Sequence, residues 1–405
     1  MKSLVVFGID VSSRQSTVAV VINRQKLPEF KISNDLIGFK RLGKELELYH
    51  QPQIIFEATG VYSRRLQAFL ERNNYDYIRM NPLTAKKLMD NNLRHNKTDR
   101  TDAVSLALIQ FANPQKVSYV EPQVYQEMQA NSRIYEQFSH DLVKYKNRLH
   151  RALQLTFPEI EQLMTPIGKN YWRIVQRYPH PQLVLRENET SIAAKLKLLS
   201  GIGPKRSHYL AQQLVNLAKQ SCSAVSVDSA EIWGIRANLM ALRFAYRQCQ
   251  TAVKKLNQLS KQLPGKDLDI YTSIPGIAKT TALRLIAELG DLRRFNKPNQ
   301  IDAFVGIDPS RYQSGKTDKH LGITKHGNAI ARKILYRTIG QIESASKTNP
   351  CHIADYYNKR KKSSHSQGYK KIAIAAVHKL IRTAYALIKN NQLYDYSVAN
   401  KNQRL

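Results

Sequence analysis

The first 80 residues restrict the fold of this chain most strongly, because they alternate between strand patterns and helix patterns. Three short segments rich in β-branched residues, 4–11, 16–22 and 27–32, are separated only by polar turns, which predicts an antiparallel meander. A helical stretch, an apolar run at 54–58, a second helix and a strand-like segment at 75–80 follow. This order predicts an α/β domain with helices packed on its sheet.

Four acidic residues fall at the ends of these elements. Asp10 closes the first strand, Glu57 closes the fourth, and Asp99 and Asp102 lie three apart at the start of a helix, where they share a face. Three antiparallel strands followed by alternating helices and strands is the order of an RNase H-like domain. In that fold the first and fourth strands are neighbours and the last helix packs beside them, so we expect the four carboxylates to converge.

Four converging carboxylates repel one another unless a hard divalent cation neutralises them. We therefore expect two Mg²⁺ ions, about 4 Å apart, that would clamp a scissile phosphate. Taken singly, Asp99 could instead be a helix cap and Glu57 a charged strand end in solvent.

The charge balance indicates the kind of partner. Lys and Arg number 63 against 31 Asp and Glu, a net charge of +32, which favours a polyanion such as nucleic acid. No apolar run approaches the ~18 residues that span a bilayer, so no membrane partner is expected. The first residues lack a signal-peptide cleavage pattern, which favours a cytoplasmic location. The three cysteines are far apart and form no zinc-binding or disulfide pattern, which fits a reducing compartment.

Two long helices are expected in the middle of the chain, at 122–156 and at about 230–262, and they predict a helical arm over residues 116–265. In the second helix the apolar residues alternate steps of four and three, as in a coiled coil. They are Ile235, Leu239, Leu242, Tyr246, Cys249, Val253 and Leu256. This seam is consistent either with packing inside one chain or with a dimerisation arm.

Two segments, 199–214 and 273–289, share a Gly-Ile core and resemble helix-hairpin-helix units. The free amides at the start of the second helix of such a unit bind phosphate oxygens without reading bases, with Lys205 and Arg206 as added cations in the first copy. Ala278 replaces the second glycine of the motif in the second copy. Plain helix packing explains that copy equally well.

The segment 309–328 is expected to be a loop in which Ser314 precedes Gly315 among many cations. A serine hydroxyl is a weak nucleophile that needs a base, a metal or a positive field. On composition alone, simple phosphate binding is the better explanation of this loop. The candidate phosphate contacts are Arg311, Lys316, Lys319, Lys325 and Arg332.

Five motifs together closely resemble a known family. They read FGIDVS, FEATG, KTDRTDA, SIPGIAKTTALRLIAELGDLRRF and YQSGKTDKHLGITKHGNAIARKIL. These motifs are similar to those of the DEDD (RuvC-like) insertion-sequence transposases, the family that includes the Piv-type DNA invertases and the recombinases guided by a bridge RNA. The resemblance covers roughly residues 4–156 and 270–390.

The resemblance implies a fold, a reaction and a set of partners. It implies a RuvC-like catalytic domain at 1–115 and a mostly helical C-terminal domain at 266–405 that carries the serine. It assigns metal binding to Asp10, Glu57, Asp99 and Asp102, and the nucleophile to Ser314. The implied partners are donor and target double-stranded DNA, a noncoding guide RNA and further copies of the chain, as a dimer or tetramer at the prokaryotic nucleoid.

Two other functions remain open at this stage. The same carboxylates could activate water, which would give a metal-dependent nuclease of the Holliday-junction type. Alternatively, the chain could be a nonenzymatic helix-hairpin-helix protein that only binds nucleic acid.

Overall fold

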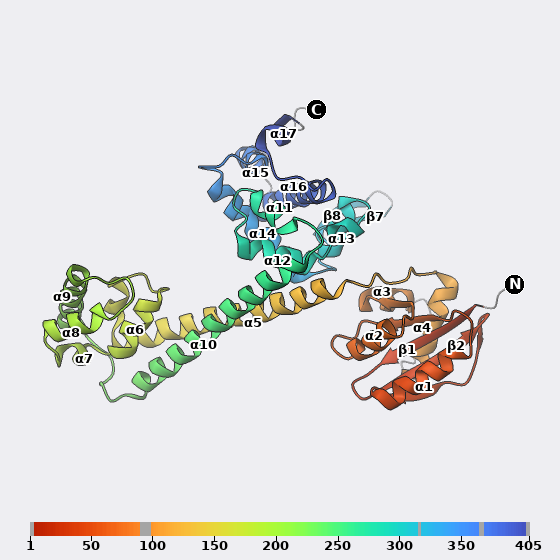
Figure 1. Cartoon of the computed structure of the whole chain (residues 1–405), viewed down its shortest axis with the longest axis horizontal. Coiled ribbons are helices and arrows are strands. Elements are labelled where there is room, and N and C mark those ends of the chain that lie inside the picture. The colour runs from red at the N-terminus through yellow and green to blue at the C-terminus, as the bar shows by residue number, and fades with distance from the viewer. Residues whose placement is uncertain (1–3, 90–98, 315–316, 364–367, 402–405) are drawn as a thin grey trace. The chain divides into compact units, whose positions relative to one another are not determined.

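A computed structural model describes residues 4–89, 99–314, 317–363 and 368–401, without the side chains of residues 99–100, 311–314, 317–321 and 400–401. The chain divides into two compact units, Met1–Glu121 and Pro122–Leu405 (Figure 1). Across the described ranges, no helix is both long and apolar enough to cross a membrane.

The first unit is a mixed α/β domain built around one sheet. Its elements are β1 (Val5–Val11), β2 (Gln15–Ile22), β3 (Gln25–Lys26), β4 (Phe30–Ser33), α1 (Leu36–Glu47), β5 (Gln53–Glu57), α2 (Ser63–Arg72), β6 (Tyr77–Met80), α3 (Pro82–Met89) and α4 (Asp99–Ala112). The strand order is β3-β2-β1-β5-β6, and β4 also pairs with β2. Strands β1 and β2 are antiparallel, whereas β1, β5 and β6 are parallel to one another.

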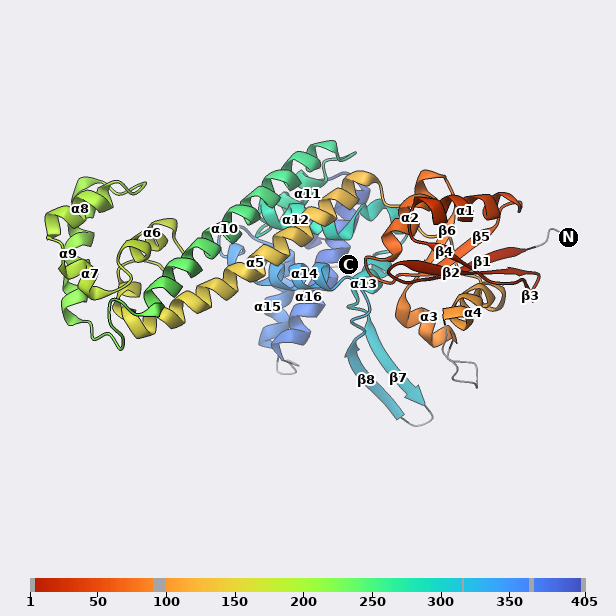
Figure 2. The same ribbon diagram turned by 90° about the horizontal axis from the view of Figure 1, so that it is seen from below.

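Each face of this sheet is covered by a pair of helices (Figure 2). On one face, Phe7 and Phe56 pack with buried leucines of α1 and α2. On the other face, Val6 and Ile55 pack with Ala107 and other buried residues of α3 and α4. Because side chains alternate along a strand, each residue of β1 and β5 can be assigned to one face.

The predicted third strand, 27–32, is only partly correct. The chain forms a two-residue turn at Asn23 and Arg24, both with positive φ, and the short β3 follows it. Strand β4 begins only at Phe30, because Pro28 has no amide hydrogen to donate to a sheet.

The second unit is mostly helical. Its first part comprises α5 (Gln123–Thr156), η1 (Pro158–Gln162), α6 (Lys169–Arg177), α7 (Pro181–Leu185), α8 (Glu189–Lys197), α9 (Pro204–Gln220), α10 (Ala230–Leu259) and η2 (Ser260–Gln262). Its second part comprises α11 (Asp267–Ser273), α12 (Lys279–Leu289), η3 (Leu292–Arg294), α13 (Pro298–Val305), β7 (Pro309–Ser314), β8 (Thr317–Ile323), α14 (Ala329–Ala345), α15 (His352–Lys362), α16 (Tyr369–Lys389) and α17 (Tyr396–Lys401).

The two predicted long helices are confirmed as α5 and α10, which lie side by side along their lengths (Figures 1 and 2). Five of the seven seam residues of α10 are buried, and they face α5 of the same chain. The coiled-coil seam is therefore satisfied by intramolecular packing. A second copy of the chain would have to use another surface of the arm.

Both segments with a Gly-Ile core form a turn between two packed helices, α8 and α9 in the first case and α11 and α12 in the second. The second turn is covered by α14, since a Cβ added at Gly276 would lie 2.6 Å from the Cα of Ile342. This close packing gives the second glycine turn a structural reason to exist. Phosphate binding by either turn stays a prediction.

The core of the C-terminal region contains a buried histidine. His352 stacks on the ring of Tyr394, with 5.5 Å between ring centroids. Its Nδ1 lies 2.8 Å from the hydroxyl of Tyr394, and its Nε2 lies 3.1 Å from Oγ1 of Thr383. Because the Thr383 hydroxyl donates to the carbonyl of Lys379, it accepts from Nε2–H, which fits a neutral ring.

Burial, with a smaller contribution from the charge of Lys379, lowers the pKa of His352 to about 4. An unfolded histidine has a pKa of about 6.5. Between these values the unfolded chain binds a proton that the folded chain does not, so stability falls as pH falls from 6.5 to 4.

In the parent chain, His352 should lower the free energy of unfolding by about 2 kcal/mol between pH 7 and pH 4.5. We expect the His352→Gln variant to lack this part of the decrease, as measured by urea unfolding at the two pH values. The variant His140→Gln, which replaces an exposed histidine of α5, should keep the full pH dependence. Equal pH dependence in His352→Gln and the parent chain would show that His352 is not the group responsible.

Candidate active site

Two of the predicted metal ligands lie at the carboxyl ends of neighbouring parallel strands. Strands β1 and β5 pair in parallel up to Ile9 and Phe56, so Asp10 and Glu57 occupy the next position at the carboxyl ends of the two strands. Alternation puts Asp10 on the same face as Val6, and puts Glu57 on the same face as Ile55. Both carboxylates therefore belong to the sheet face that α3 and α4 cover.

Helix α4 approaches this face at very short range. A Cβ added at Gly8 would lie 2.1 Å from the carbonyl oxygen of Ala103 and 2.7 Å from the backbone nitrogen of Ala107. Only a glycine leaves room for the helix here. Asp102 directly precedes Ala103, and Asp10 lies two residues beyond Gly8 on the same sheet face.

Asp99 is the first residue of α4, one turn before Ala103. Its side chain lies outside the described residues. Among the side chains that the structure describes, no three His, Cys, Asp or Glu residues are close enough to hold a metal ion. The fold thus brings Asp10, Glu57 and the start of α4 to one face of the sheet.

The expectation of a loop around Ser314 is wrong. Residues Pro309–Ser314 and Thr317–Ile323 form an antiparallel two-stranded sheet, in which Ser314 pairs with Thr317. The sequence held a signal for this hairpin, because a two-residue Gly-x connection such as Gly315-Lys316 is typical of tight β-hairpins. The side chains of Ser314, Arg311 and Lys319, and the whole of Lys316, lie outside the described residues.

The base of this hairpin is fixed to the helical core. The hydroxyl of Thr324 donates to the carboxylate of Asp308 over 2.5 Å, and the amide of Lys325 donates to the carbonyl of Gly306 over 3.0 Å. A Cβ added at Gly327 would lie 2.4 Å from the carbonyl oxygen of Phe304. The two chain segments that lead into and out of the hairpin are therefore held in contact.

A buried carboxylate completes this base. Glu288 of α12 has no exposed surface, and Nδ2 of Asn328 donates to its Oε2 over 2.9 Å. Asn328 also caps α14, since its Oδ1 accepts from the amides of Ile330 and Ala331. Sequence reasoning missed both residues, although an Asn before a helical pattern and an acid within an apolar stripe are detectable signals.

The remaining predicted basic contacts have different environments. Lys325 is exposed and has a positive φ of 59°. Arg332 is half-buried, and its guanidinium donates to the carbonyl of Val305 over 2.7 Å, so it supports the hairpin base. Lys205 and Arg206 are exposed in the first turn of α9.

Comparisons with known proteins match the two regions that carry the motifs, 4–156 and 270–390. A family model described as a transposase, of the DEDD type, matches residues 7–158, and a model described as a transposase of the IS116/IS110/IS902 family matches residues 268–358. Together the two matches cover more than half of the chain.

Several curated proteins are similar to this chain. The transposase for insertion sequence element IS1111A of Coxiella burnetii is 25% identical over 244 residues, which are 60% of this chain and 54% of that protein. The pilin gene-inverting protein of Moraxella bovis is 24% identical over 220 residues, 52% of this chain and 60% of that protein. The transposase for element IS1328 of Yersinia enterocolitica is 25% identical over 146 residues, 35% of this chain and 43% of that protein. The chain spans about half the length of these relatives.

The α/β unit and the matches to both regions define the class, which is that of the DEDD transposases. The mixed sheet of the first unit is consistent with the RNase H-like domain of that class. Within the class, the chain belongs to the IS110 family. Membership implies dependence on a divalent metal ion, and the oxygen donors of Asp10, Glu57 and Asp102 have the hard-ligand chemistry that suits such an ion.

The close approach of α4 to β1 gives a test of how the acidic residues are positioned. In Gly8→Ala the new Cβ meets backbone atoms, so α4 has to shift, and we expect a loss of about 2 to 3 kcal/mol in the stability of the first unit. Thermal unfolding and hydrogen exchange of α4 would measure this loss.

The matched control is Gly234→Ala in α10, where a Cβ meets no atom within 4 Å. That variant should be neutral or stabilised by up to about 1 kcal/mol, because alanine favours a helix over glycine. A Gly8→Ala protein as stable as the parent would contradict the close packing of α4 on β1.

Proposed function

We propose that this chain is a DNA recombinase that cleaves strands, holds one end through a serine ester and rejoins strands. Two of its relatives are named as transposases and one as a pilin gene-inverting protein, and we extend strand cleavage and transfer to this chain. The observation that supports the proposal best is the arrangement of Asp10 and Glu57 on the sheet face against which the start of α4 packs.

In this proposal Asp10, Glu57, Asp99 and Asp102 hold the divalent metal, and we infer Mg²⁺, two ions per site. When bound, the metal would stabilise negative charge on the scissile phosphate. Such an ion would also relieve the repulsion between like charges at the start of α4 and at the two strand ends.

Ser314 is the proposed nucleophile. Its Oγ attacks phosphorus, the serine proton is lost, and the deoxyribose oxygen of the leaving strand takes up a proton. The new serine phosphodiester replaces the broken one, so its energy is kept and the strand can be rejoined without ATP. Arg311, Lys316, Lys319 and Lys325 are the proposed contacts to the phosphate and its neighbours.

Nucleic acid is the proposed partner, because the chain carries a net charge of +32. We propose double-stranded donor and target DNA and a noncoding guide RNA, with Lys205, Arg206 and the glycine turns as added backbone contacts. We also propose a dimer or tetramer. An exposed apolar surface on α10, where Trp233 is 75%, Met240 66% and Phe244 50% exposed, supports contact with a second copy.

A covalent adduct tests the serine mechanism. The protein is incubated with Mg²⁺, a plasmid that carries the DNA flanking its gene, and RNA transcribed from that DNA, and is then denatured. We expect a protein–DNA adduct that Ser314→Ala reduces at least about a thousandfold. Ser310→Ala, which removes the other serine hydroxyl of the same strand, should leave the adduct intact.

Asp99→Ala separates this mechanism from the alternatives. If Asp99→Ala abolishes cleavage while Ser314→Ala cleaves at the parent rate, water is the nucleophile and the chain is a junction-type nuclease. If the parent chain binds the DNA but does not cleave it in the presence of Mg²⁺ or of Mn²⁺, the chain only binds nucleic acid.

A further inference from the structure

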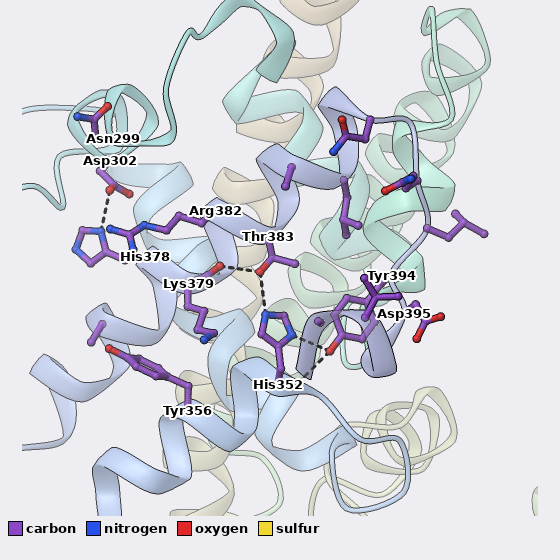
Figure 3. Close-up of a pocket in the computed structure, with 18 of the residues that line it drawn as sticks. Asn299, Asp302, His352, Tyr356, His378, Lys379, Arg382, Thr383, Tyr394 and Asp395 are labelled. Atoms are coloured by element: carbon purple, nitrogen blue, oxygen red, sulfur yellow. Dashed lines mark hydrogen bonds and ion pairs between the residues drawn. The ribbon is translucent and has the colours of Figure 1, made fainter. Parts of the chain in front are cut away.

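A pocket of about 1130 Å³ opens in the C-terminal region, and the proposed chemistry does not use it. Helices α13, α15 and α16 and the segment 390–399 line it (Figure 3). Pro309 also lines the pocket and is the first residue of β7, so the pocket adjoins the base of the Ser314 hairpin. Its volume is sufficient for a ligand as large as a nucleotide.

Cationic side chains of α16 form one wall. His378 and Arg382 are four residues apart and share a helix face, and Lys379 lies beside them (Figure 3). The two carboxylates that line the pocket have partners other than Lys379 and Arg382, since Asp302 pairs with Nδ1 of His378 at 2.9 Å and Asp395 accepts from Ser397.

Two cations of this wall remain available for a ligand. Among the residues that the structure describes, neither Lys379 nor Arg382 forms an ion pair with a carboxylate. A phosphate group in the pocket would supply the missing negative charge.

Aromatic rings also line the pocket. The ring of Tyr356 has two cations over it, with Nζ of Lys379 5.0 Å and Cζ of Arg360 5.1 Å from the ring centroid. Tyr394 is held flat against His352, with an interplanar angle of 14°. The ring of Tyr394, which this stacking holds in place, is the better surface on which a base can stack.

Amide side chains stand around the same space. Asn299, Asn390 and Gln392 line the pocket, and each offers a donor and an acceptor. Amides of this kind pair with the edge of a base. The rings and amides argue against a bare phosphate as the ligand, because phosphate would contact neither. The two cations without carboxylate partners argue against an apolar ligand.

We propose that this pocket binds one unstacked nucleotide of a single-stranded segment, with its phosphate at Lys379 and Arg382 and its base against Tyr394. The inference rests on the proposed function, because it gives the nucleic-acid partner a defined contact beside the serine hairpin. Unpaired bases occur both in RNA loops and in a displaced DNA strand, and the two share this chemistry.

Photocrosslinking with the full chain tests this site. The probes are single-stranded RNA and DNA of about 15 nucleotides, each with one 5-iodouracil, since a single-strand site covers roughly 4 to 16 nucleotides. We expect crosslinks to Tyr394 in peptide mass spectra, and about tenfold fewer when the probe is annealed to its complement. The probe that gives the higher crosslink yield shows whether the site binds RNA or DNA.

A variant that fills the pocket without changing its charge sharpens the test. Ala386 lines the pocket and is exposed, so Ala386→Trp should occupy it and lower the crosslink yield about tenfold. Arg382→Gln, at an exposed position, should also lower the yield. Ser344→Trp, at an exposed position of α14 outside the pocket, should have no effect.

Two results would overturn the inference. One is a set of crosslinks that lie entirely outside the pocket, and the other is an unchanged yield in Ala386→Trp. If the serine adduct forms while the pocket gives no crosslink, this inference alone fails. If the pocket crosslinks while no adduct forms, the proposed function alone fails.

Discussion

The packing of α4 on β1 is the constraint on which the rest of the first unit depends. The carbonyl of Ala103 comes so near Gly8 that no side chain fits between helix and strand. This contact fixes the start of α4 above β1, the strand that carries Asp10 near its carboxyl end. Acidic residues from distant parts of the sequence thereby share one sheet face, an arrangement whose repulsion a divalent cation would relieve.

The hairpin with Ser314 depends on a different set of contacts in the second unit. Glu288 is fully buried, receives a hydrogen bond from Asn328, and has the guanidinium Nε of Arg133 at 3.9 Å from its Oε2. Burial of a polar carboxyl group is costly unless it is hydrogen-bonded, and the contact with Asn328 reduces this cost at Oε2. In our proposal the metal carboxylates and the serine belong to separate compact units, so cleavage would require both units to act on one phosphate.

Local sequence patterns predicted many of the helices and strands, whereas the remaining features depend on contacts between residues that are distant in the sequence. Strand β1 and the long helices could be predicted, because alternation and the 3.6-residue period are visible in sequence. Strand β4 begins later than expected because Pro28 interrupts the sheet, and the Ser314 segment is a hairpin rather than a loop. The acid within the apolar stripe of α12 was a signal for Glu288, but its partner Asn328 and the contact of Gly8 with Ala103 could not be predicted, since folding alone brings these residues together.

Metal binding by the first unit tests the central claim most directly. Electron paramagnetic resonance of the full chain titrated with Mn²⁺ should show about two sites. Asp10→Asn should weaken binding at least tenfold, whereas Asp76→Asn, which changes an exposed acid before β6, should not. Equal Mn²⁺ binding by Asp10→Asn and the parent chain would contradict the assignment of a metal site to this sheet face.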